Sequence, residues 1–316
     1  MSEIKKIATR ESYGNGLVEL GKKYSDFVVL DADLAEATKT GIFKKNFPDR
    51  FYDCGIAEQN MISIAAGIAA TGKKVFASSF AMFAAGRAFE QVRNSVAYPH
   101  LHVIIGATHA GLSVGEDGAT HQCCEDIALM RTIPGMTVIN PADDTEARAA
   151  LEVAYNSDGP VYIRFGRLPA PVIFGSDYKF VIGKGTEVRS GNDVTVIANG
   201  LMLSKAIEAS EVLKEKGINV RVINMPTVKP IDEEIIIKAA KETGRIITVE
   251  EHSVIGGLGS AVCDVVCEHY PVPVTKIGVN DVFGCSGPAR EVLDKYGLNT
   301  ENIINTVLSV VKNGDK

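Results

Sequence analysis

Residues 53–77 read DCGIAEQNMISIAAGIAATGKKVFA and contain one helix-to-strand unit of a pattern that recurs along the chain. Gln59–Ala70 has the length and apolar spacing of a helix, and Val75–Ala77 is a brief apolar run typical of a buried strand. Units of the same kind lie on both sides: strand-like Phe27–Leu30, Val103–Ile105, Thr137–Ile139 and Val161–Ile163, and helical Phe83–Val96 and Thr145–Tyr155. This alternation predicts a mostly parallel sheet covered by helices on both faces.

The pattern breaks over residues 168–192, where Pro, Gly and short polar pieces indicate a linker with a small hairpin. A second alternating series follows, with strands at Val194–Ala198, Val220–Ile223, Ile246–Val249 and Val274–Ile277 and helices near Leu203–Lys216, near Asp232–Lys241 and after Gly259. We therefore predict an α/β protein of two domains, each a mostly parallel sheet flanked by helices. The first domain is expected at residues 1–175, the linker at 176–190 and the second domain at 191–316.

The composition excludes several classes of protein. The 316 residues are 46% hydrophobic and carry a net charge of −6, which favours a folded chain and argues against a nucleic-acid or polybasic membrane surface. No run of about 18 apolar residues is present, and the start lacks the apolar core of a signal peptide. The 6 cysteines include no C-x-x-C pair, so reduced thiols are expected. A cytoplasmic location is the resulting expectation.

Polar residues gather where the predicted strands of the first domain end. In open parallel sheets, ligands bind beyond the carboxyl ends of the strands. The residues at these positions are Asp31, Asp33, Thr108, His109, Arg164 and Arg167, together with Glu116, Asp117 and His121 in the loop GLSVGEDGATHQ (111–122) and Glu58 just before a helix. On this evidence alone, the sequence predicts a ligand-binding α/β protein.

Each of these residues also has a purely structural interpretation. Glu58 is placed to interact with a helix dipole, and Asp117-Gly118 is typical of a turn. A lone arginine such as Arg164 is by default a member of an ion pair. The histidines are equally compatible with a satisfied core or surface position, and Phe80 and Phe83 with an ordinary core. Spacing does not separate these alternatives.

A resemblance to a known family favours the functional interpretation. It is carried by three blocks of sequence: DCGIAEQNMISIAAGIA (53–69), SSFAMFAAGRAFEQVR (78–93) and THAGLSVGEDGATHQ (108–122). They resemble the pyrimidine-binding domain of transketolases, a family that depends on thiamine diphosphate. The resemblance continues through VYIRFGR (161–167), and TVEEHSVIGGLGSAV (248–262) looks like the carboxyl-terminal domain of that family. It covers essentially the whole chain.

The resemblance also indicates a missing part. Thiamine-diphosphate enzymes hold the diphosphate through a metal bound by a Gly-Asp-Gly segment and a later Asn, and no Gly-Asp-Gly occurs here. Full-length transketolases are roughly twice this length. The chain therefore resembles the carboxyl-terminal subunit of a split, two-chain transketolase. This implies activity only with an amino-terminal partner chain that holds Mg²⁺ (or Ca²⁺), in a heterotetramer; no metal ligand is expected in this chain.

The resemblance implies roles for individual residues on the cofactor side. Glu58 matches the glutamate that hydrogen-bonds the aminopyrimidine ring and favours its imino tautomer, so that the thiazolium carbon loses its proton. Phe80 and Phe83 match the aromatic segment that packs on the pyrimidine. Gly86 replaces a later aromatic residue of many transketolases, which leaves open which ring stacks. Asp33 matches an aspartate that approaches the cofactor of the neighbouring protomer.

On the substrate side, Asp117 and His121 match residues that bind the hydroxyls of the donor sugar, and His121 is also implied to stabilise the reaction intermediate. His109, Arg164 and Arg10 match phosphate-binding positions, and Arg suits a phosphate dianion because it binds bidentately. The family's phosphate-binding serine near Asp33 is not evident, and Thr38 is the available substitute.

The predicted activity is transfer of a two-carbon ketol unit from a ketose phosphate to an aldose phosphate. The alternatives are a fragment of deoxyxylulose-phosphate synthase, whose histidine loop is closely related, and the β-subunit of a 2-oxo-acid dehydrogenase. A third hypothesis is a non-catalytic assembly subunit. In the second domain, Glu250, Glu251 and His252 are expected to follow a strand and to cap or form an interface, without a part in catalysis.

Overall fold

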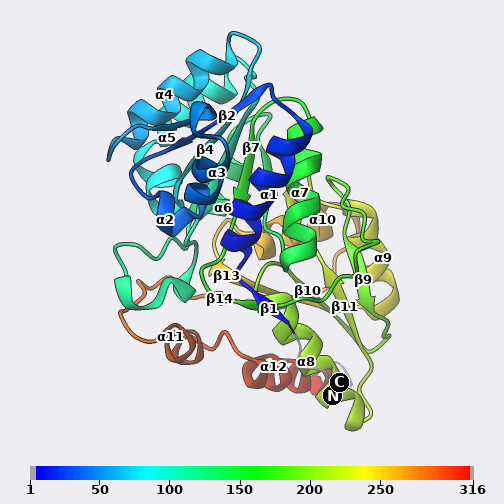
Figure 1. Cartoon of the computed structure of the whole chain (residues 1–316). Helices are drawn as coiled ribbons and strands as arrows, with labels where there is room; N and C mark the ends of the chain where they lie inside the picture. Colours follow the sequence, from blue (N-terminus) through cyan, green and yellow to red (C-terminus); the bar gives the residue numbers. More distant parts are fainter. Residues whose placement is uncertain (1–4, 314–316) are drawn as a thin grey trace.

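The computed structural model describes residues 5–313, which form two α/β domains, each built on its own sheet (Figure 1). The sheet of the first domain has seven strands, in the spatial order β12 (Thr227–Lys229), β6 (Thr137–Ile139), β7 (Val161–Arg164), β5 (Val103–Thr108), β4 (Lys74–Phe80), β2 (Phe27–Asp31) and β3 (Phe51–Asp53). All neighbours pair in parallel except β12, which is antiparallel to β6. The predicted mostly parallel sheet is confirmed.

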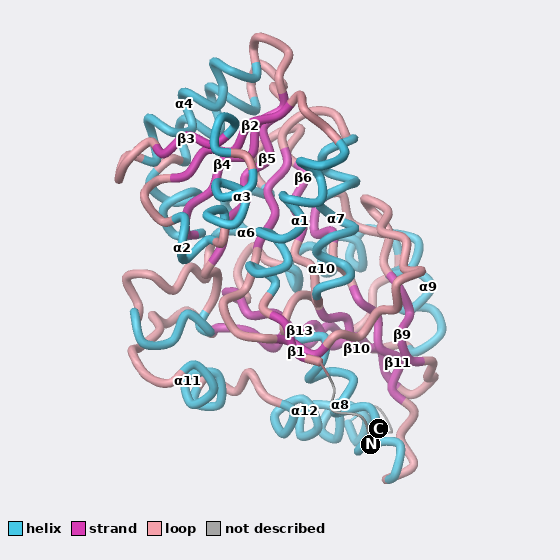
Figure 2. Tube along the Cα trace, viewed as in Figure 1, coloured by secondary structure: helices cyan, strands magenta, loops and turns pink. Residues whose placement is uncertain are grey.

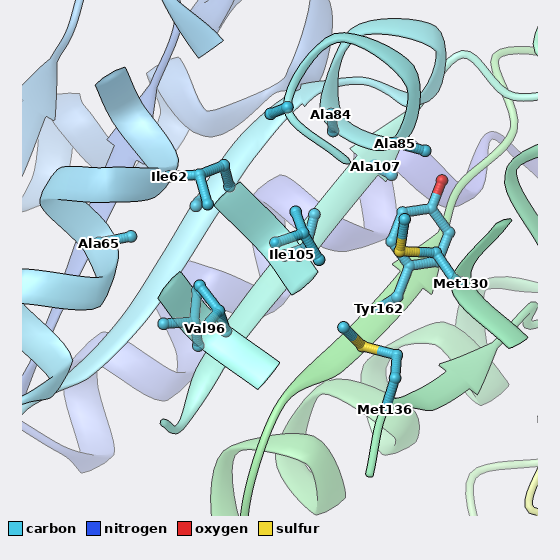
Figure 3. Close-up of a cluster of buried hydrophobic side chains, with 14 of the residues drawn as sticks. Ile62, Ala65, Ala84, Ala85, Val96, Ile105, Ala107, Met130, Met136 and Tyr162 are labelled. Atoms are coloured by element: carbon cyan, nitrogen blue, oxygen red, sulfur yellow. The ribbon is translucent and has the colours of Figure 1, made fainter. Parts of the chain in front are cut away.

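Helices cover both faces of this sheet. One face carries α1 (Thr9–Lys23), α3 (Thr40–Asn46) and α7 (Asp144–Asn156), and the other carries α4 (Glu58–Ala69), α5 (Phe89–Gln91) and α6 (Asp126–Arg131). Because side chains alternate along a strand, Phe76 of β4 packs toward the first face and Ala77 toward the second. Figure 3 shows the second face, where Ile62 of α4 lies near Ile105 of β5 and Met130 of α6 lies near Tyr162 of β7.

The predicted helix at Phe83–Val96 forms, but two wide π-helical turns interrupt it. These are η2 (Met82–Arg87) and η3 (Val92–Ala97), on either side of α5. In η2 the backbone N–H of Ala88 donates to the carbonyl oxygen of Phe83, five residues earlier, at 3.2 Å. A π turn accommodates one extra residue and occurs frequently at functional sites. Apolar periodicity alone does not reveal it.

The second domain has a five-stranded sheet, in the order β14 (Val274–Val279), β13 (Ile246–Ser253), β10 (Val194–Ala198), β11 (Val220–Asn224) and β9 (Thr186–Arg189). Only β9 is antiparallel to its neighbour. One face packs on α8 (Met202–Glu215) and α12 (Thr300–Asn313), which lie against each other in Figure 2. The other face packs on α9 (Glu233–Thr243) and α10 (Leu258–His269). The remaining short elements are β1 (Lys6–Ile7), α2 (Ala35–Thr38), η1 (Pro48–Arg50), η4 (Leu112–Asp117), β8 (Ala170–Pro171) and α11 (Ala289–Lys295).

The segment expected to be a linker differs from the prediction in one respect. Residues 168–192 form no hairpin: β8 pairs with β1 near the start of the chain, whereas β9 joins the second sheet beside β11. Each of these strands finds a partner far away in sequence. In addition, β12 of the second half completes the edge of the first sheet. The two domains are therefore connected by β12 in the first sheet as well as by the linker.

Among residues 5–313, no helix has both the length and the apolar character needed to cross a membrane.

Candidate functional site

Six side chains predicted for the site form a chain of contacts at the carboxyl ends of β4 and β5, which we call the strand-end cluster. Its members are Arg10, Glu58, Phe80, Phe83, His109 and His121. Glu58 joins the others through Arg87, whose guanidinium contacts both Glu58 and Phe83. The residues come from six different elements and loops, so the fold brings together what lies more than 100 positions apart in sequence.

Glu58 is the first residue of α4, so its side chain starts at the positive end of the helix dipole. The side chain is only 2% exposed. Its Oε2 accepts a hydrogen bond from Arg87 Nη1 at 3.1 Å, and within the described part of the chain its Oε1 has no hydrogen-bond donor. Both interpretations of Glu58 therefore hold: it is an acid in the first turn of a helix, and one of its oxygens is available to a ligand.

The aromatic members of the cluster form a wall. The ring of Phe80 stacks on His109 with centroids 3.9 Å apart and planes at 25°. Phe83 meets His121 edge-on, at 5.4 Å and 80°, and lies 6.1 Å from Phe80. Phe80 is nearly buried, whereas Phe83 and His121 are partly exposed. Such a wall offers a flat apolar face and, at His121 Nε2, a ring nitrogen to a ligand.

His109 is held as a neutral imidazole. Arg10 Nη1 donates to His109 Nε2 at 3.0 Å, which assigns the ring proton to Nδ1, where it donates to Thr108 Oγ1 at 2.9 Å. Burial, followed by the charges of Arg10 and Arg167, lowers the pKa of His109 to about 3. The backbone of His109 also lies in the left-handed region at φ 57°, an uncommon conformation for a residue other than glycine.

The loop that carries His121 is held by the second domain. Gln122 Nε2 donates to the carbonyl oxygen of Cys285 at 2.9 Å, and the buried Glu251 accepts from Ser113 N–H at 2.5 Å. A β-carbon at Gly111 would lie 2.4 Å from Glu251 Oε1, so only glycine permits this approach. The second domain thereby sets the position of a loop of the first.

Asp117 and Asp33 are not brought into contact with the strand-end cluster. Asp117 ends η4 with an exposed side chain, and its side chain makes no hydrogen bond within residues 5–313. Asp33 is exposed at φ 60° and borders a groove of about 590 Å³ that residues of α2 and α3 also line. Thr38 is buried and donates to Asp31 Oδ2 at 2.8 Å, so its hydroxyl serves the fold.

Arg164 is not at the site. The side chain is 4% exposed, and its Nε donates to Asp126 Oδ2 at 2.9 Å. Its Nη2 donates to the carbonyl oxygens of Cys123 and Glu251, at 3.2 and 2.8 Å. This corrects the expected phosphate contact: the ion-pair alternative describes Arg164, which fastens the two domains together.

Sequence reasoning missed the roles of two cations. Arg87 lies inside the block 78–93, but only the π turn of η2 shows that it reaches Glu58. Arg167 stands at a strand end, where the sequence gives it no particular role. Burial is the main cause of the lowered pKa of both Arg10 and His109, and the charge of Arg167 adds to it. Arg167 also pairs with Glu116 at 2.6 Å. Arg167 is therefore better placed than Arg164 for the expected phosphate contact.

The expectation for the acidic pair of the second domain is confirmed, although these residues lie within β13 and not after it. Glu250 accepts from the N–H groups of Leu258 and Gly259, at 2.6 and 2.8 Å, and so caps α10. Glu251 forms the interface already described.

The fold and the cluster define a class of protein: paired open α/β domains that offer a buried carboxylate, an aromatic wall and nearby cations to a ring-bearing, anionic ligand. Residues 5–171 match the model of the transketolase pyrimidine-binding domain, and residues 183–303 match that of the transketolase C-terminal domain. The chain belongs to the transketolase family.

Individual relatives narrow this to the split type. The chain is 51% identical to a provisionally named transketolase C-terminal section of Methanocaldococcus jannaschii, over 96% of each chain. It is 42% identical to one of the subunits of an apulose-4-phosphate transketolase of Phocaeicola vulgatus, over 97% of this chain and 98% of that one. Human transketolase is 39% identical over 97% of this chain but only 49% of its own length.

A solved split-gene transketolase, an inactive β4 tetramer, superposes with a TM-score of 0.91 at 52% identity, covering 97% of this chain and 99% of that one. The protein is accordingly a split-type transketolase subunit, a transferase, and the synthase and dehydrogenase alternatives are not favoured.

The strand-end cluster fits the cofactor of the family, thiamine diphosphate. Phe80 and Phe83 provide apolar ring faces of the kind that an aminopyrimidine stacks on. The uncommitted Oε1 of Glu58 is a hydrogen-bond acceptor on a buried side chain that Arg87 connects to Phe83.

Proposed function

We propose that this chain, together with an amino-terminal partner chain, transfers a two-carbon ketol unit from a ketose phosphate to an aldose phosphate with thiamine diphosphate as cofactor. The observation that carries the proposal is the strand-end cluster. In it the buried carboxylate of Glu58 and the aromatic wall lie together with two cations, Arg10 and Arg87. A relative of matching length is named for a phosphorylated sugar, which agrees with this choice of substrate.

When bound, thiamine diphosphate supplies the carbon nucleophile to which the ketol unit is attached. Glu58 holds a proton at Oε1, between its own oxygen and the pyrimidine nitrogen. Phe80 and Phe83 orient the ring by stacking, and the packing of β4 behind them excludes water from that face. His121, at the open side of the wall, binds the sugar hydroxyls from its partly exposed ring.

Arg10 and Arg167 bind the sugar phosphate in this proposal. Because His109 is neutral, it adds no third positive charge, and it keeps Arg10 in place through Nε2. Two guanidinium groups match a phosphate dianion in charge and geometry. Asp117 is a further hydroxyl ligand, and Asp33 reaches a neighbouring protomer; both depend on the assembled enzyme.

We propose further that the partner chain holds the diphosphate and Mg²⁺, and that the two chains form a cytoplasmic heterotetramer of the pentose phosphate pathway. Two observations support the division of labour: both matched domains lie outside the diphosphate-binding part of the family, and the match spans half of human transketolase.

The test is reconstitution. This chain is purified with its presumed amino-terminal partner, and thiamine diphosphate and Mg²⁺ are added. Ketol transfer between sugar phosphates is then compared with pyruvate decarboxylation. Transfer by the pair, and by neither chain alone, is the expected result. Decarboxylation without transfer, or transfer by this chain alone, would refute the proposal.

A further inference from the structure

Arg87 connects two members of the strand-end cluster that do not otherwise share a polar contact. Its Nη1 donates to Glu58 Oε2 at 3.1 Å, and its guanidinium lies over the ring of Phe83, 5.1 Å from the centroid. Phe83 and Arg87 are four positions apart on η2, and such residues lie on one face of a helical turn. One side chain therefore fixes both the carboxylate and the partly exposed ring of the wall.

The charge of Glu58 needs such a partner. A carboxylate removed from water is unfavourable unless it is paired and hydrogen-bonded, and the Glu58 side chain is only 2% exposed. Across residues 5–313, Arg87 is the cation that forms an ion pair with it. The dipole of α4 adds a smaller favourable field from the other direction.

The hydrogen bond is also directional. Arg87 occupies Oε2 alone, so the carboxylate keeps Oε1 for a further donor. The guanidinium is itself half exposed, which leaves it able to follow the carboxylate when a ligand enters. A residue with this geometry orients the acid and does not compete for the oxygen that acts.

We propose that Arg87 is the positioning residue of the site: it fixes the Glu58 carboxylate through Oε2 and leaves Oε1 for a ligand, and it holds Phe83 in the orientation that receives a ring. The role of the oriented carboxylate rests on the proposed function, whereas the coupling of Arg87 to Glu58 is a property of this chain alone.

The first test uses this chain without cofactor or partner. Glu58→Gln, Arg87→Met and the double variant are unfolded in denaturant at one protein concentration. Because Met retains the aliphatic packing of Arg, the cycle isolates the charged contact. The expected coupling is a factor of about 3 to 10 in the unfolding equilibrium constant. If the effects of the two single variants on the unfolding equilibrium constant add up to that of the double variant within a factor of about two, the proposed coupling is wrong.

The second test uses the assembled two-chain enzyme with thiamine diphosphate and Mg²⁺. The readouts are the dissociation constant of the cofactor, by calorimetry, and hydrogen–deuterium exchange at its thiazolium C2, by NMR. Arg87→Met is expected to slow exchange about 10- to 100-fold at saturating cofactor, with the dissociation constant changed less than about threefold. Arg87→Lys, which keeps the charge, is expected to restore part of the exchange rate.

Arg93→Met is the matched control, because Arg93 is exposed on the neighbouring η3 and donates to Asn94. It should match the unmodified enzyme in both readouts. Equal exchange in the Arg87→Met and Arg93→Met enzymes would overturn the positioning role, as would a loss confined to cofactor affinity. If Arg87→Met does not fold, Arg87→Gln and Arg87→Lys answer the same question. Absence of ketol transfer by the unmodified pair would refute the proposed function, and the first test would still decide the contact.

Discussion

Both domains gather acidic and histidine side chains toward the carboxyl ends of interior strands, but the two groups differ in how many of their hydrogen-bond donors and acceptors are already used. In the carboxyl half of β13, both oxygens of Glu250 accept backbone N–H groups, and His252 is fully buried. His252 Nδ1 donates to the carbonyl oxygen of Ser253, and its Nε2 accepts from Ala128 N–H. At the ends of β4 and β5, Glu58 keeps one oxygen free and His121 keeps its ring partly exposed.

The difference shows that a polar strand end is a ligand site only where its groups retain unused donors or acceptors. A carboxylate whose lone pairs are all taken by the backbone stabilises a helix start, and no acceptor is left for a ligand. The second domain contributes to the site indirectly, by holding the loop of His121 through Gln122 and Glu251.

The largest contrast is expected between Glu58→Gln and Glu250→Gln. Glu58→Gln should lower ketol transfer by the two-chain enzyme by a factor of roughly 10²–10⁴, because the amide cannot hold the proton at Oε1. Glu250→Gln should lower the denaturation midpoint and leave the rate per folded molecule unchanged. Steady-state kinetics and denaturant unfolding of both variants check this. Similar losses of rate in the two variants would remove the distinction between the strand ends.

Next in size is the expected effect of Arg164→Met on stability. Removing Arg164 leaves Asp126 buried and unpaired, which should lower the free energy of unfolding by about 3–5 kcal/mol. Arg189→Met, at an exposed pair with Glu211, should cost less than about 1 kcal/mol. Urea unfolding measures both. If Arg164→Met leaves stability unchanged but raises the KM for sugar phosphates, Arg164 binds the phosphate after all and the correction is wrong.

Glu146 extends the comparison to a carboxylate of the first domain whose oxygens are spent at the domain junction. Its Oε1 accepts from Tyr178 Oη at 2.5 Å and from Asn224 Nδ2 at 2.7 Å, and burial raises its pKa from 4.5 to about 7. A raised folded-state pKa stabilises the protein fully below pH 4.5, and that contribution is lost as the pH rises through about 7.

The expected loss from this group is on the order of 3 kcal/mol over that range. The free energy of unfolding is measured against pH for the unmodified chain and for Glu146→Gln, which cannot titrate. Subtracting the two curves removes the other titrating groups, including His109. A constant difference across the range would show that Glu146 does not take up a proton on folding.

The smallest effect is expected at the phosphate end of the site. Arg167→Met should raise the KM for a phosphorylated donor by roughly 10- to 100-fold, as loss of one charged hydrogen bond implies, with little change in kcat. Glu116→Gln, which removes only the ion-pair partner of Arg167, serves as the control. Equal increases of KM for phosphorylated and unphosphorylated donors would contradict a phosphate contact.

The sequence predicted the alternation of strands and helices closely, because burial on both faces leaves an unbroken apolar signal in each parallel strand. Val103–Ile105 lies within β5, and Thr145–Tyr155 within α7. Among the edge strands within residues 5–313, it predicted β14 and missed β3, β9 and β12. β9 and β12 are short, half polar or next to proline, and each is stabilised by a partner that local pattern does not reveal.

The same limit separates the correct from the corrected site residues. Glu58, Phe80 and His109 follow from the chain order of a helix start and two strand ends, and the structure joins them in one cluster. Arg164 and Arg167 are both basic and three positions apart at one strand end, and sequence alone offers no reason to prefer either. Only the packing of the second domain on β7 buries the first and leaves the second partly exposed.

By itself, then, the sequence determined the class of fold and the family, since both depend on local periodicity and on short blocks of side chains. The tertiary structure decided which polar groups remain free, because a hydrogen-bond donor or acceptor is used up by whatever packs against it. It used Glu250 to cap α10 and used Glu251 and Arg164 at the junction of the domains. Through the π turn of η2 it placed Arg87 on the one carboxylate of the strand-end cluster, which retains a free oxygen.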